Sequence, residues 1–441
     1  MAFIIDKQTL NDLKIFGKVK GNSIYGLFNA TRTRGGSAIL EEMFRYPLSD
    51  VDKINRRTAI IRFFMEKKIT FGFRNDWFDT IEHYLSNTDE RTRLHPAGDT
   101  FRRKLRNLIG ADVDYRQLQK GVMASINLLN SVSRFLHRLG DIDEHYKDEA
   151  QALEAYINEP VFAWVKKEQK VRKLSYAKMV VYDDALRYKG VELFRKILRL
   201  LYNIDVYTAI AKVAEEHSFV FAKAYPPGDN ILKIEGLYHP LLDHPIPNSI
   251  AIDATHNVVF LTGANMAGKS TFMKSFGIVV YLAHMGFPVP VKAMEFSVQN
   301  GMCTTINLPD NMNLGYSHFY AEVQRLKKVA EQVGRTGNLV IVFDELFRGT
   351  NVKDAHEATV EVMKAFAEKR NCIFMISTHI IEAGNDLKKA CDNIKYVYLP
   401  TVMKDGKPSY TYTITEGITD DRHGMMIVNN EHIIDILKSK L

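Results

Sequence analysis

The stretch Val258 to Thr271 reads V-V-F-L-T-G-A-N-M-A-G-K-S-T. A short apolar run that ends in Gly-x-x-x-x-Gly-Lys-Ser is typical of a buried strand followed by a phosphate-binding loop and a helix. Gly263 and Gly268 let backbone N–H groups approach a phosphate, since neither residue carries a side chain. Lys269 supplies a positive charge for the β- and γ-phosphates, and the Ser270 hydroxyl is a ligand for Mg²⁺. The following helix directs its positive end at the same anion. The stretch therefore predicts a nucleoside triphosphate site.

The bulk composition indicates a soluble globular protein. The chain has 441 residues, 46% of them hydrophobic and 25% charged, so two or three domains are expected. Its three cysteines, Cys303, Cys372 and Cys391, lack metal-ligand spacing and are expected to be reduced thiols. We recognise neither a signal peptide nor an apolar run long enough to span a bilayer. A cytoplasmic location without membrane contact is the resulting prediction.

The net charge of +7 is unevenly distributed along the chain. Residues 1–225 contain 38 Lys and Arg against 29 Asp and Glu, whereas the remainder contains 21 against 23. A basic first part indicates an acidic partner such as DNA. Its most basic clusters are Arg102–Arg106 and the group Lys166, Lys167, Lys170, Arg172 and Lys173. The alternative is that this excess belongs to an ordinary solvated helical surface.

Two domains of different class are predicted. In residues 1–228, apolar side chains recur at spacings of three and four, which favours an all-α domain. Pro226-Pro227-Gly228 marks the boundary. Residues 229–441 alternate short β-rich runs with helical segments, which predicts an α/β P-loop domain with a largely parallel sheet and residues 258–262 at its centre. The expected strands are 231–234, 250–252, 258–262, 339–343, 372–377, 396–399 and 410–414.

Two further strands are expected to bring chemical groups to the phosphate loop. Five apolar residues, 339–343, precede Asp344 and Glu345, so both carboxylates lie at the end of a buried strand. Asp344 is the predicted Mg²⁺ ligand, and Glu345 is the predicted general base. His379 follows another apolar strand, and we expect it to contact the γ-phosphate or polarise water. The alternative for Asp344 and Glu345 is an acidic turn after a core strand, and the alternative for His379 is a plain surface histidine.

The order of these motifs resembles the ATPase domain of the MutS family of DNA mismatch-repair proteins, which is of the ABC type. The motifs that carry the resemblance are Gly263–Thr271, Asp310–Asn311 with Gly315–Glu322, Asp344–Thr350 and Ser377–His379. Tyr238–Leu241 is similar to the family's Arg-His-Pro entry to this domain. Ile5–Leu13 and Arg45–Arg57 resemble the start of the family's helical core, or lever, domain.

The resemblance implies roles for individual residues. Asn265 would contact the γ-phosphate, and Ser317 would reach the nucleotide of a second subunit, although Ser317 also fits a plain helix N-cap. Where the family has an aromatic residue that stacks on adenine, this chain has Pro245, and at a second position beside adenine it has Tyr412. Phe347 stands where the family has a glycine. The expected nucleotide contacts are Gly263, Ala264, Asn265, Met266, Ala267, Gly268, Lys269, Ser270, Thr271, Ser317 and Tyr412. The expected catalytic residues are Glu345, His379 and Lys269, and the expected metal ligands are Ser270 and Asp344.

The chain starts where the family's lever domain starts, so we expect no mismatch-reading or connector domain. The predicted function is that of a MutS-like protein that binds and hydrolyses ATP with Mg²⁺ as a homodimer with composite sites. Movement of its lever domain would act on double-stranded or branched DNA in mismatch repair or recombination. The alternative is a nucleotide-switched protein-interaction module that binds no DNA.

Overall fold

The structure is a computed structural model that describes residues 2–17, 22–87, 90–95, 110–168, 173–228, 230–264, 266–306, 318–347, 349–404, 407–419 and 433–438. The chain forms two compact units. The first unit comprises Met1–Phe28, Met43–Thr58 and Val213–Leu441, and the second comprises Asn29–Glu42 and Ala59–Lys212. The division between them falls inside three helices, α3 (Arg34–Arg45), α4 (Val51–Glu66) and α10 (Val191–His217).

The first unit is built on a seven-stranded sheet with the order β1-β9-β10-β11-β6-β12-β15. All neighbouring strands are parallel except β12 and β15. The strands are β1 (Ile4–Ile5), β9 (Gly301–Thr305), β10 (Leu339–Asp344), β11 (Ile373–Ser377), β6 (Val258–Gly263), β12 (Ile394–Leu399) and β15 (Thr415–Glu416). Because β6 lies between β11 and β12, the predicted interior strand in a largely parallel sheet is confirmed.

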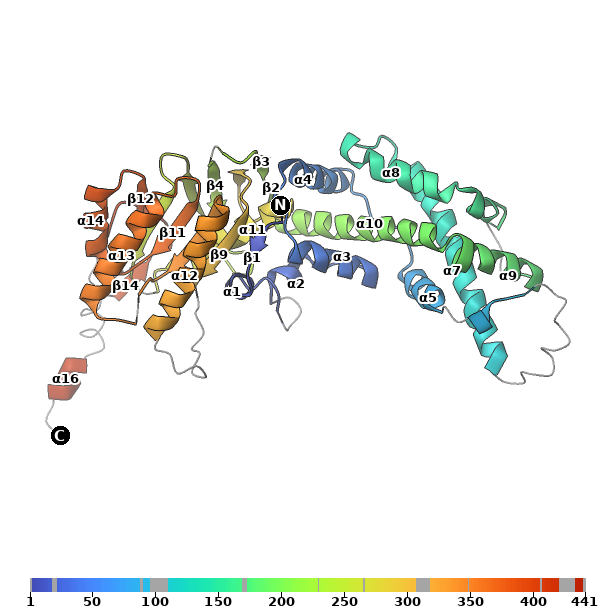
Figure 1. Ribbon diagram of the computed structural model, residues 1–441, viewed down its shortest axis with the longest axis horizontal. Coiled ribbons are helices and arrows are strands. Elements are labelled where there is room, and N and C mark those ends of the chain that lie inside the picture. Colours follow the sequence, from blue (N-terminus) through green and yellow to red (C-terminus); the bar gives the residue numbers. More distant parts are fainter. Residues whose placement is uncertain are drawn as a thin grey trace. The chain divides into compact units, whose positions relative to one another are not determined.

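Helices cover the interior strands, which explains their nearly continuous apolar sequences. Every residue of β10 and β11 is buried. One face of these strands packs against α12, α13 and α14 in a single apolar cluster that includes Phe260, Ile341, Met363 and Phe374. These helices are drawn in orange and red in Figure 1. The helices that follow the strands are α11 (Lys269–His284), α12 (His318–Thr336), α13 (Val352–Ala367), α14 (Ile381–Ala390) and α16 (Ile433–Lys438).

Smaller sheets complete the first unit. A four-stranded sheet has the order β3-β8-β4-β5, and two antiparallel two-stranded sheets are β2-β7 and β13-β14. Their strands are β3 (Lys223–Tyr225), β8 (Ala293–Ser297), β4 (Leu232–Leu237), β5 (Asn248–Ile252), β2 (Val220–Phe221), β7 (Pro288–Val289), β13 (Thr401–Lys404) and β14 (Lys407–Tyr410). Two short helices, α1 (Lys7–Asp12) and α2 (Ile24–Phe28), precede them in the chain.

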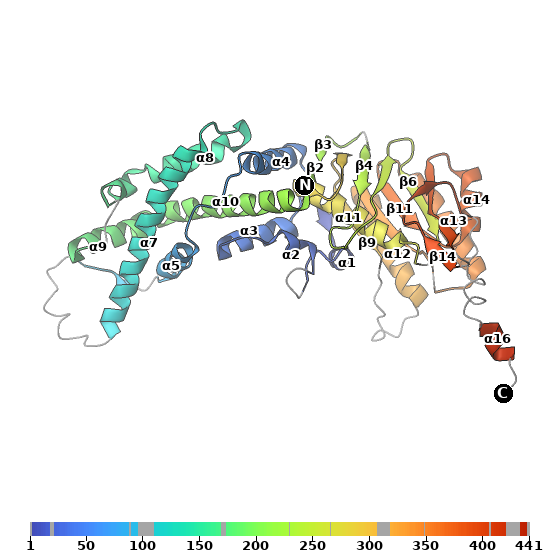
Figure 2. The same ribbon diagram turned by 180° about the vertical axis from the view of Figure 1, so that it is seen from behind.

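The described residues of the second unit form helices and no strand. Besides its parts of α3, α4 and α10, its elements are α5 (Asn75–Ser86), η1 (Glu90–Thr92), α7 (Gly110–Leu139), α8 (Glu144–Ile157), η3 (Pro160–Phe162), η4 (Val165–Glu168), α9 (Tyr176–Asp183) and η5 (Asp184–Lys189), which is a π-helical turn. A buried ion pair joins Arg187 to Asp183 at 2.6 Å, and the Tyr84 hydroxyl donates to the same carboxylate at 2.8 Å. Figure 2 shows these helices from behind.

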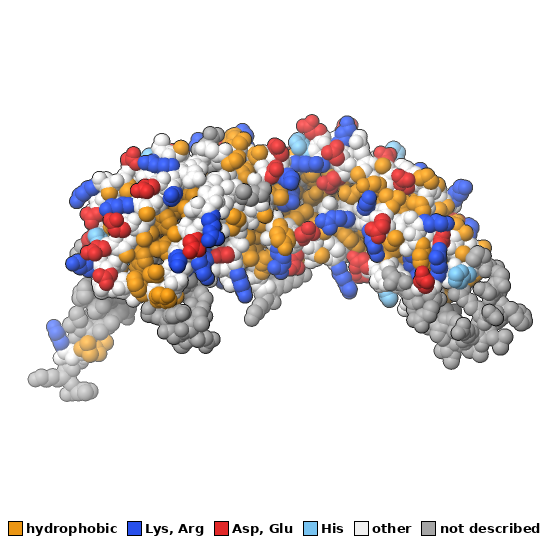
Figure 3. Space-filling view, in the orientation of Figure 1, with side chains coloured by type: hydrophobic (Ala, Val, Ile, Leu, Met, Phe, Trp, Pro, Cys, Tyr) orange, Lys and Arg blue, Asp and Glu red, His pale blue; other side chains and the backbone are white. Residues whose placement is uncertain are grey.

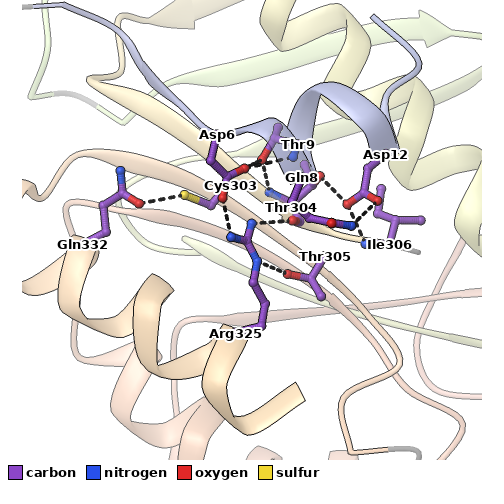
Figure 4. Close-up of polar contacts among 10 residues, drawn as sticks. All are labelled: Asp6, Gln8, Thr9, Asp12, Cys303, Thr304, Thr305, Ile306, Arg325 and Gln332. Atoms are coloured by element: carbon purple, nitrogen blue, oxygen red, sulfur yellow. Dashed lines mark hydrogen bonds and ion pairs between the residues drawn. The ribbon is translucent and has the colours of Figure 1, made fainter. Parts of the chain in front are cut away.

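The predicted single boundary at residue 228 differs from the observed division, because early residues pack in the first unit. Strand β1 pairs with β9 at the edge of the main sheet. The buried Asp12 carboxylate accepts hydrogen bonds from the Thr304 hydroxyl at 2.7 Å and from Ile306 N–H at 2.9 Å (Figure 4). Thr9 accepts from Thr304 N–H at 2.9 Å. These contacts connect residues that are almost 300 positions apart, which local periodicity does not reveal.

An ion pair continues this network onto α12. Arg325 pairs with Asp6 and also donates to the Thr304 carbonyl at 2.8 Å and to the Thr305 hydroxyl at 3.1 Å (Figure 4). Burial raises the pKa of Asp6, but hydrogen bonds from Arg325 and Thr9 outweigh that effect and hold the pKa below its usual value of 3.8. The N-terminal residues therefore connect a sheet edge to a helix that covers the sheet.

Most predicted strands are confirmed, with ends shifted by one to three residues, but the prediction of a strand over 410–414 is wrong. Strand β14 ends at Tyr410 and β15 begins at Thr415. Tyr412, between them, has a φ of 55°, which is left-handed and incompatible with a strand. The sequence predicts none of β1, β2, β3, β7, β8, β9, β13 and β15, and the first three correct the expectation that residues 1–228 are all-α. No helix in the described part of the chain combines the length and apolar composition that a membrane span requires.

Removal of the Asp12 carboxylate is expected to destabilise the first unit. The substitution Asp12→Ala leaves the Thr304 hydroxyl and Ile306 N–H without their acceptor in a buried site. We expect the free energy of unfolding to fall by about 2–4 kcal/mol, as measured by urea denaturation. The control is Lys7→Ala on the exposed side of the same helix, for which a change below about 0.5 kcal/mol is expected. Equal losses for both variants would contradict the assignment.

Candidate nucleotide site

Three parallel strands end at one edge of the main sheet and bring the predicted site residues together. Asp344 of β10 pairs with Ser377 of β11, and Ser377 pairs with Leu261 of β6, two residues before Gly263. On the other side of β6, Leu399 pairs with Gly263. Because the carboxyl ends of parallel strands in one sheet share an edge, this register places the loop after β6 beside Asp344 and Glu345.

The loop after β6 has the backbone geometry that its glycines predict. Gly263 has a φ of 143°, and a Cβ at this position would lie 3.1 Å from the carbonyl oxygen of Leu399. Gly268 precedes the first residue of α11 with a φ of 101°. Met266 also has a positive φ, 71°, and is 79% exposed. The loop thus makes a tight turn into a helix N-terminus, which is the arrangement that binds a phosphate.

The Lys269 ammonium lies inside this turn. Its Nζ donates to the carbonyl oxygens of Gly263 at 2.8 Å and Ala264 at 3.2 Å, and it lies 3.6 Å from Glu345 Oε1. The side chain is only 4% exposed. A buried cation requires such acceptors, and an anionic phosphate is a stronger acceptor than a neutral carbonyl. The predicted phosphate-neutralising residue is therefore at the loop, next to the predicted base.

The two carboxylates after β10 are held in different ways. The Ser377 hydroxyl donates to Asp344 Oδ1 at 2.5 Å. The same hydroxyl accepts from the backbone N–H of Glu345 at 3.0 Å. Glu345 has a φ of 55°, so its side chain leaves the strand direction, and its Oε2 lies 3.8 Å from His379 Nδ1. Glu345 is thus placed between Lys269 and His379, and the latter is 57% exposed.

A cleft of about 780 Å³ lies over the loop and contains most of the predicted contacts. Its polar lining includes Lys269, Ser270 and Glu345, and its apolar lining includes Leu242, Pro245, Ile246 and Tyr412. The remaining predicted residues along the cleft are Ala264, Met266, Ala267, Gly268 and Thr271. A lining with both charged and apolar side chains suits a nucleotide, which has charged phosphates and a flat base.

His239 lines the same cleft as a neutral imidazole. Burial, together with the charges of Lys274 and Lys14, lowers the pKa of His239 from 6.5 to about 4. Its Nδ1 accepts from the backbone N–H of Leu241 at 3.3 Å. The ring therefore adds no positive charge to the cleft at neutral pH, which leaves Lys269 as the cation closest to Glu345 among those described.

Two predicted residues, Asn265 and Ser317, lie outside the described residues. Two residues whose roles the sequence reasoning missed are Ser377 and Asn248. Ser377 ends an apolar strand at the sheet edge, and Asn248 occupies a buried position in the alternation of β5, where an apolar residue is the usual choice. A polar residue at a core position of a strand is the signal that could have identified Asn248.

Comparison with known proteins supports the resemblance seen in the sequence. The family model described as MutS domain V matches residues 259–437. Relatives named DNA mismatch repair protein MutS include that of Streptococcus suis, 28% identical over 56% of the chain, and that of Pseudothermotoga lettingae, 22% identical over 97% of the chain. Residues 259–437 are therefore similar to a MutS domain, and the chain as a whole is similar to MutS proteins.

The aligned part covers 29% of the Streptococcus MutS protein and 62% of the Pseudothermotoga MutS protein, so the chain spans less than two thirds of these relatives. The MutS domain V match begins in β6 and includes the loop, Asp344, Glu345, His379 and Tyr412. Asn248 and the cleft residues at 237–246 precede the matched region, although they belong to the same compact unit.

The left-handed Gly263 should not tolerate a side chain. We expect Gly263→Ala to lower the free energy of unfolding by about 1–3 kcal/mol, because of its φ and the close Leu399 carbonyl. The control is Gly334→Ala in α12, where a Cβ meets nothing within 4 Å. That change should leave stability unaltered or raise it by up to about 1 kcal/mol. Thermal unfolding of both variants is the measurement, and a tolerated alanine at 263 would contradict the strained geometry.

Proposed function

We propose that the chain binds and hydrolyses ATP with Mg²⁺. The observation that carries this proposal is that Glu345 lies 3.6 Å from Lys269 and 3.8 Å from His379 and directly follows Asp344, beside a nucleotide-sized cleft that Lys269 and Glu345 line. They come from three places in the chain, the start of α11, the end of β10 and the segment after β11, so their proximity is a property of the fold. The MutS family is an ATPase family, which agrees with this chemistry.

Glu345 is proposed as the general base for hydrolysis. Its carboxylate would accept a proton from the attacking water, whose oxygen forms a bond to the γ-phosphorus. The bond from that phosphorus to the bridging oxygen breaks, and ADP leaves with the electron pair. Lys269 would exchange its two carbonyl acceptors for phosphate oxygens and so neutralise charge that grows during transfer. His379, close to Glu345, would orient the water or the γ-phosphate.

The residues that would hold Mg²⁺ are Ser270 and Asp344. A serine hydroxyl oxygen and a carboxylate oxygen are both ligands that Mg²⁺ prefers. Ser270 is the second residue of α11, directly after Lys269. The Ser377 hydroxyl donates a hydrogen bond to Oδ1 of Asp344, and the Asp344 carboxylate would supply an oxygen to the cation. When bound, Mg²⁺ would stabilise negative charge on the β- and γ-phosphate oxygens.

We further propose that the chain acts as a homodimer on double-stranded or branched DNA, in mismatch repair or recombination. Support comes from the relatives' name, DNA mismatch repair protein MutS, and from the excess of basic residues in 1–225. Nucleotide binding would move the helical unit as a lever domain, and Ser317 of one subunit would complete the ATP site of the other. The proposed lever domain corresponds to most of residues 1–228.

The surface of the helical unit favours DNA contact only at particular places. Lys166, Lys167 and Lys173 are exposed, whereas Arg102–Arg106 lies outside the described residues. On the face drawn in Figure 3, basic and acidic side chains are mixed, and no side of the described surface in that view is uniformly positive. This mixture is the observation that keeps the second candidate function, a nucleotide-switched protein-interaction module, in consideration.

The substitution Glu345→Gln tests the base. Since the amide cannot accept the proton, we expect kcat for ATP hydrolysis to fall at least about 100-fold, while the Kd for ATP changes less than about threefold. Phosphate release and equilibrium titration measure the two quantities. The matched control is Glu382→Gln in the first turn of α14, which should leave both unchanged. Turnover by Glu345→Gln equal to that of the unaltered protein would refute the role.

Binding to duplex, mismatched and branched DNA, with ATP and at 50 and 200 mM salt, tests the proposed partner. Contacts to phosphates predict an affinity that falls by about tenfold or more between these salt concentrations. The double variant Lys166→Ala, Lys167→Ala should weaken binding to all three DNA types to a similar degree, because phosphate contacts carry no sequence information. Absence of binding at low salt would overturn the DNA role and favour the protein-interaction module.

A further inference from the structure

The buried side-chain amide of Asn248 joins two backbone segments whose residues Ile246 and Tyr412 line the cleft. Asn248 is 9% exposed and begins β5. Its Nδ2 donates to the carbonyl oxygens of Tyr412 at 2.9 Å and Ile246 at 3.3 Å. Its Oδ1 accepts from the backbone N–H of Ile414 at 2.7 Å. One side chain therefore contacts both the segment before β5 and the segment before β15.

The segment from Thr411 to Ile414 lies outside the regular strand ladder, so its backbone groups need other hydrogen-bond partners. Its other described contacts are longer: Thr411 N–H donates to the Pro400 carbonyl at 3.4 Å, and Thr413 N–H donates to the Thr411 hydroxyl at 3.4 Å. The two contacts from Asn248 are the shortest described for this segment. They flank Tyr412, whose left-handed φ of 55° costs about 1–2 kcal/mol for a residue with a side chain.

The ring of Tyr412 lies against the phosphate loop. A Cβ on Gly268 would be 3.1 Å from Tyr412 Cδ1, so the ring packs directly over this glycine. The ring is part of the cleft lining together with Pro245 and Ile246, and both Tyr412 and Ile246 are more than 40% exposed. We call these three apolar side chains of the lining, Pro245, Ile246 and Tyr412, the apolar slot; Tyr412 brings it next to Gly268, the residue before α11. A purine ring is flat and apolar on its faces, and such apolar side chains suit it.

We propose that Asn248 is a positioning residue for the base of the bound nucleotide. By holding the backbone of Ile246 and of Tyr412 through the same amide group, it sets the width of the apolar slot. This inference rests on the proposed binding of ATP. It assigns to Asn248 no contact with phosphate and none with the reacting atoms, so it separates affinity for the base from affinity for the phosphates.

The test compares two probes, ATP and inorganic tripolyphosphate, which carries phosphates without a base. For Asn248→Ala we expect the Kd for ATP to rise about tenfold and that for tripolyphosphate to change less than twofold, both by titration calorimetry. The matched control is Asn257→Ala. Asn257 is also buried and bridges the carbonyls of Lys369 and Cys372, but it lies just before β6, at the opposite end of that strand from the loop. It should leave both Kd values unchanged.

A double-mutant cycle with Tyr412→Ala shows whether Asn248 acts through the ring. If it does, Asn248→Ala should change the Kd for ATP less than twofold in the Tyr412→Ala background. Should Asn248→Ala fail to fold, Asn248→Asp keeps an acceptor for Ile414 N–H and loses the donor to Tyr412, and the same selective loss of ATP affinity is expected.

The outcomes separate the inference from the function on which it rests. An unaltered protein that binds neither ATP nor tripolyphosphate would overturn both. An unaltered protein that binds ATP, with Asn248 variants that bind ATP equally well or lose ATP and tripolyphosphate to the same degree, would overturn the inference alone. Full additivity in the cycle would also overturn it, since Asn248 would then act independently of Tyr412.

Discussion

The parallel register of β10, β11, β6 and β12 is the constraint on which the candidate site depends. Side chains alternate between the faces of a strand, so a shift by one residue would turn Asp344 and Ser377 to the other face. In the observed register, Asp344 lies opposite Ser377, and Leu399 lies opposite Gly263. The apolar cluster between this sheet and α12, α13 and α14 stabilises that register, because a shift would disrupt the close packing of its buried side chains. Packing far from the site thus determines the geometry of the site.

The N-terminal residues extend the same dependence to the edge of the sheet. β1 adds a strand beside β9, and the Asp12 carboxylate binds the Thr304 hydroxyl and Ile306 N–H at the end of β9. Arg325, which pairs with Asp6, lies on α12, a helix of the apolar cluster. A substitution at Asp6 or Asp12 would therefore affect the sheet directly, because these side chains bond to Arg325, Thr304 and Ile306.

Local sequence was sufficient to predict the parts of the site that follow apolar strands. The run before Gly263 and the run before Asp344 are buried on both faces, so length and β-branched composition identified them. The predicted boundary at 228 differs from the observed compact units, and the strand over 410–414 is wrong, for another reason. In both places, distant partners determine the structure: Thr304 for Asp12, and Asn248 for Tyr412. A pattern of period two or 3.6 contains no information about a partner that is more than 150 residues away.

Several residues other than glycine that line the cleft have a left-handed backbone conformation, and their contacts show how the site is maintained. Met266, Glu345 and Tyr412 all have positive φ and all line it. Such conformations cost free energy and persist only where surrounding contacts fix them. For Glu345 the contact is the Ser377 hydroxyl, and for Tyr412 it is the Asn248 amide. Each fixing group is a buried polar side chain on a strand, Ser377 in the seven-stranded sheet and Asn248 in the four-stranded sheet, so the sheets carry the strain of the loops. Glu345 and Tyr412 are therefore held by two separate side chains, which allows affinity for phosphate and affinity for base to change independently.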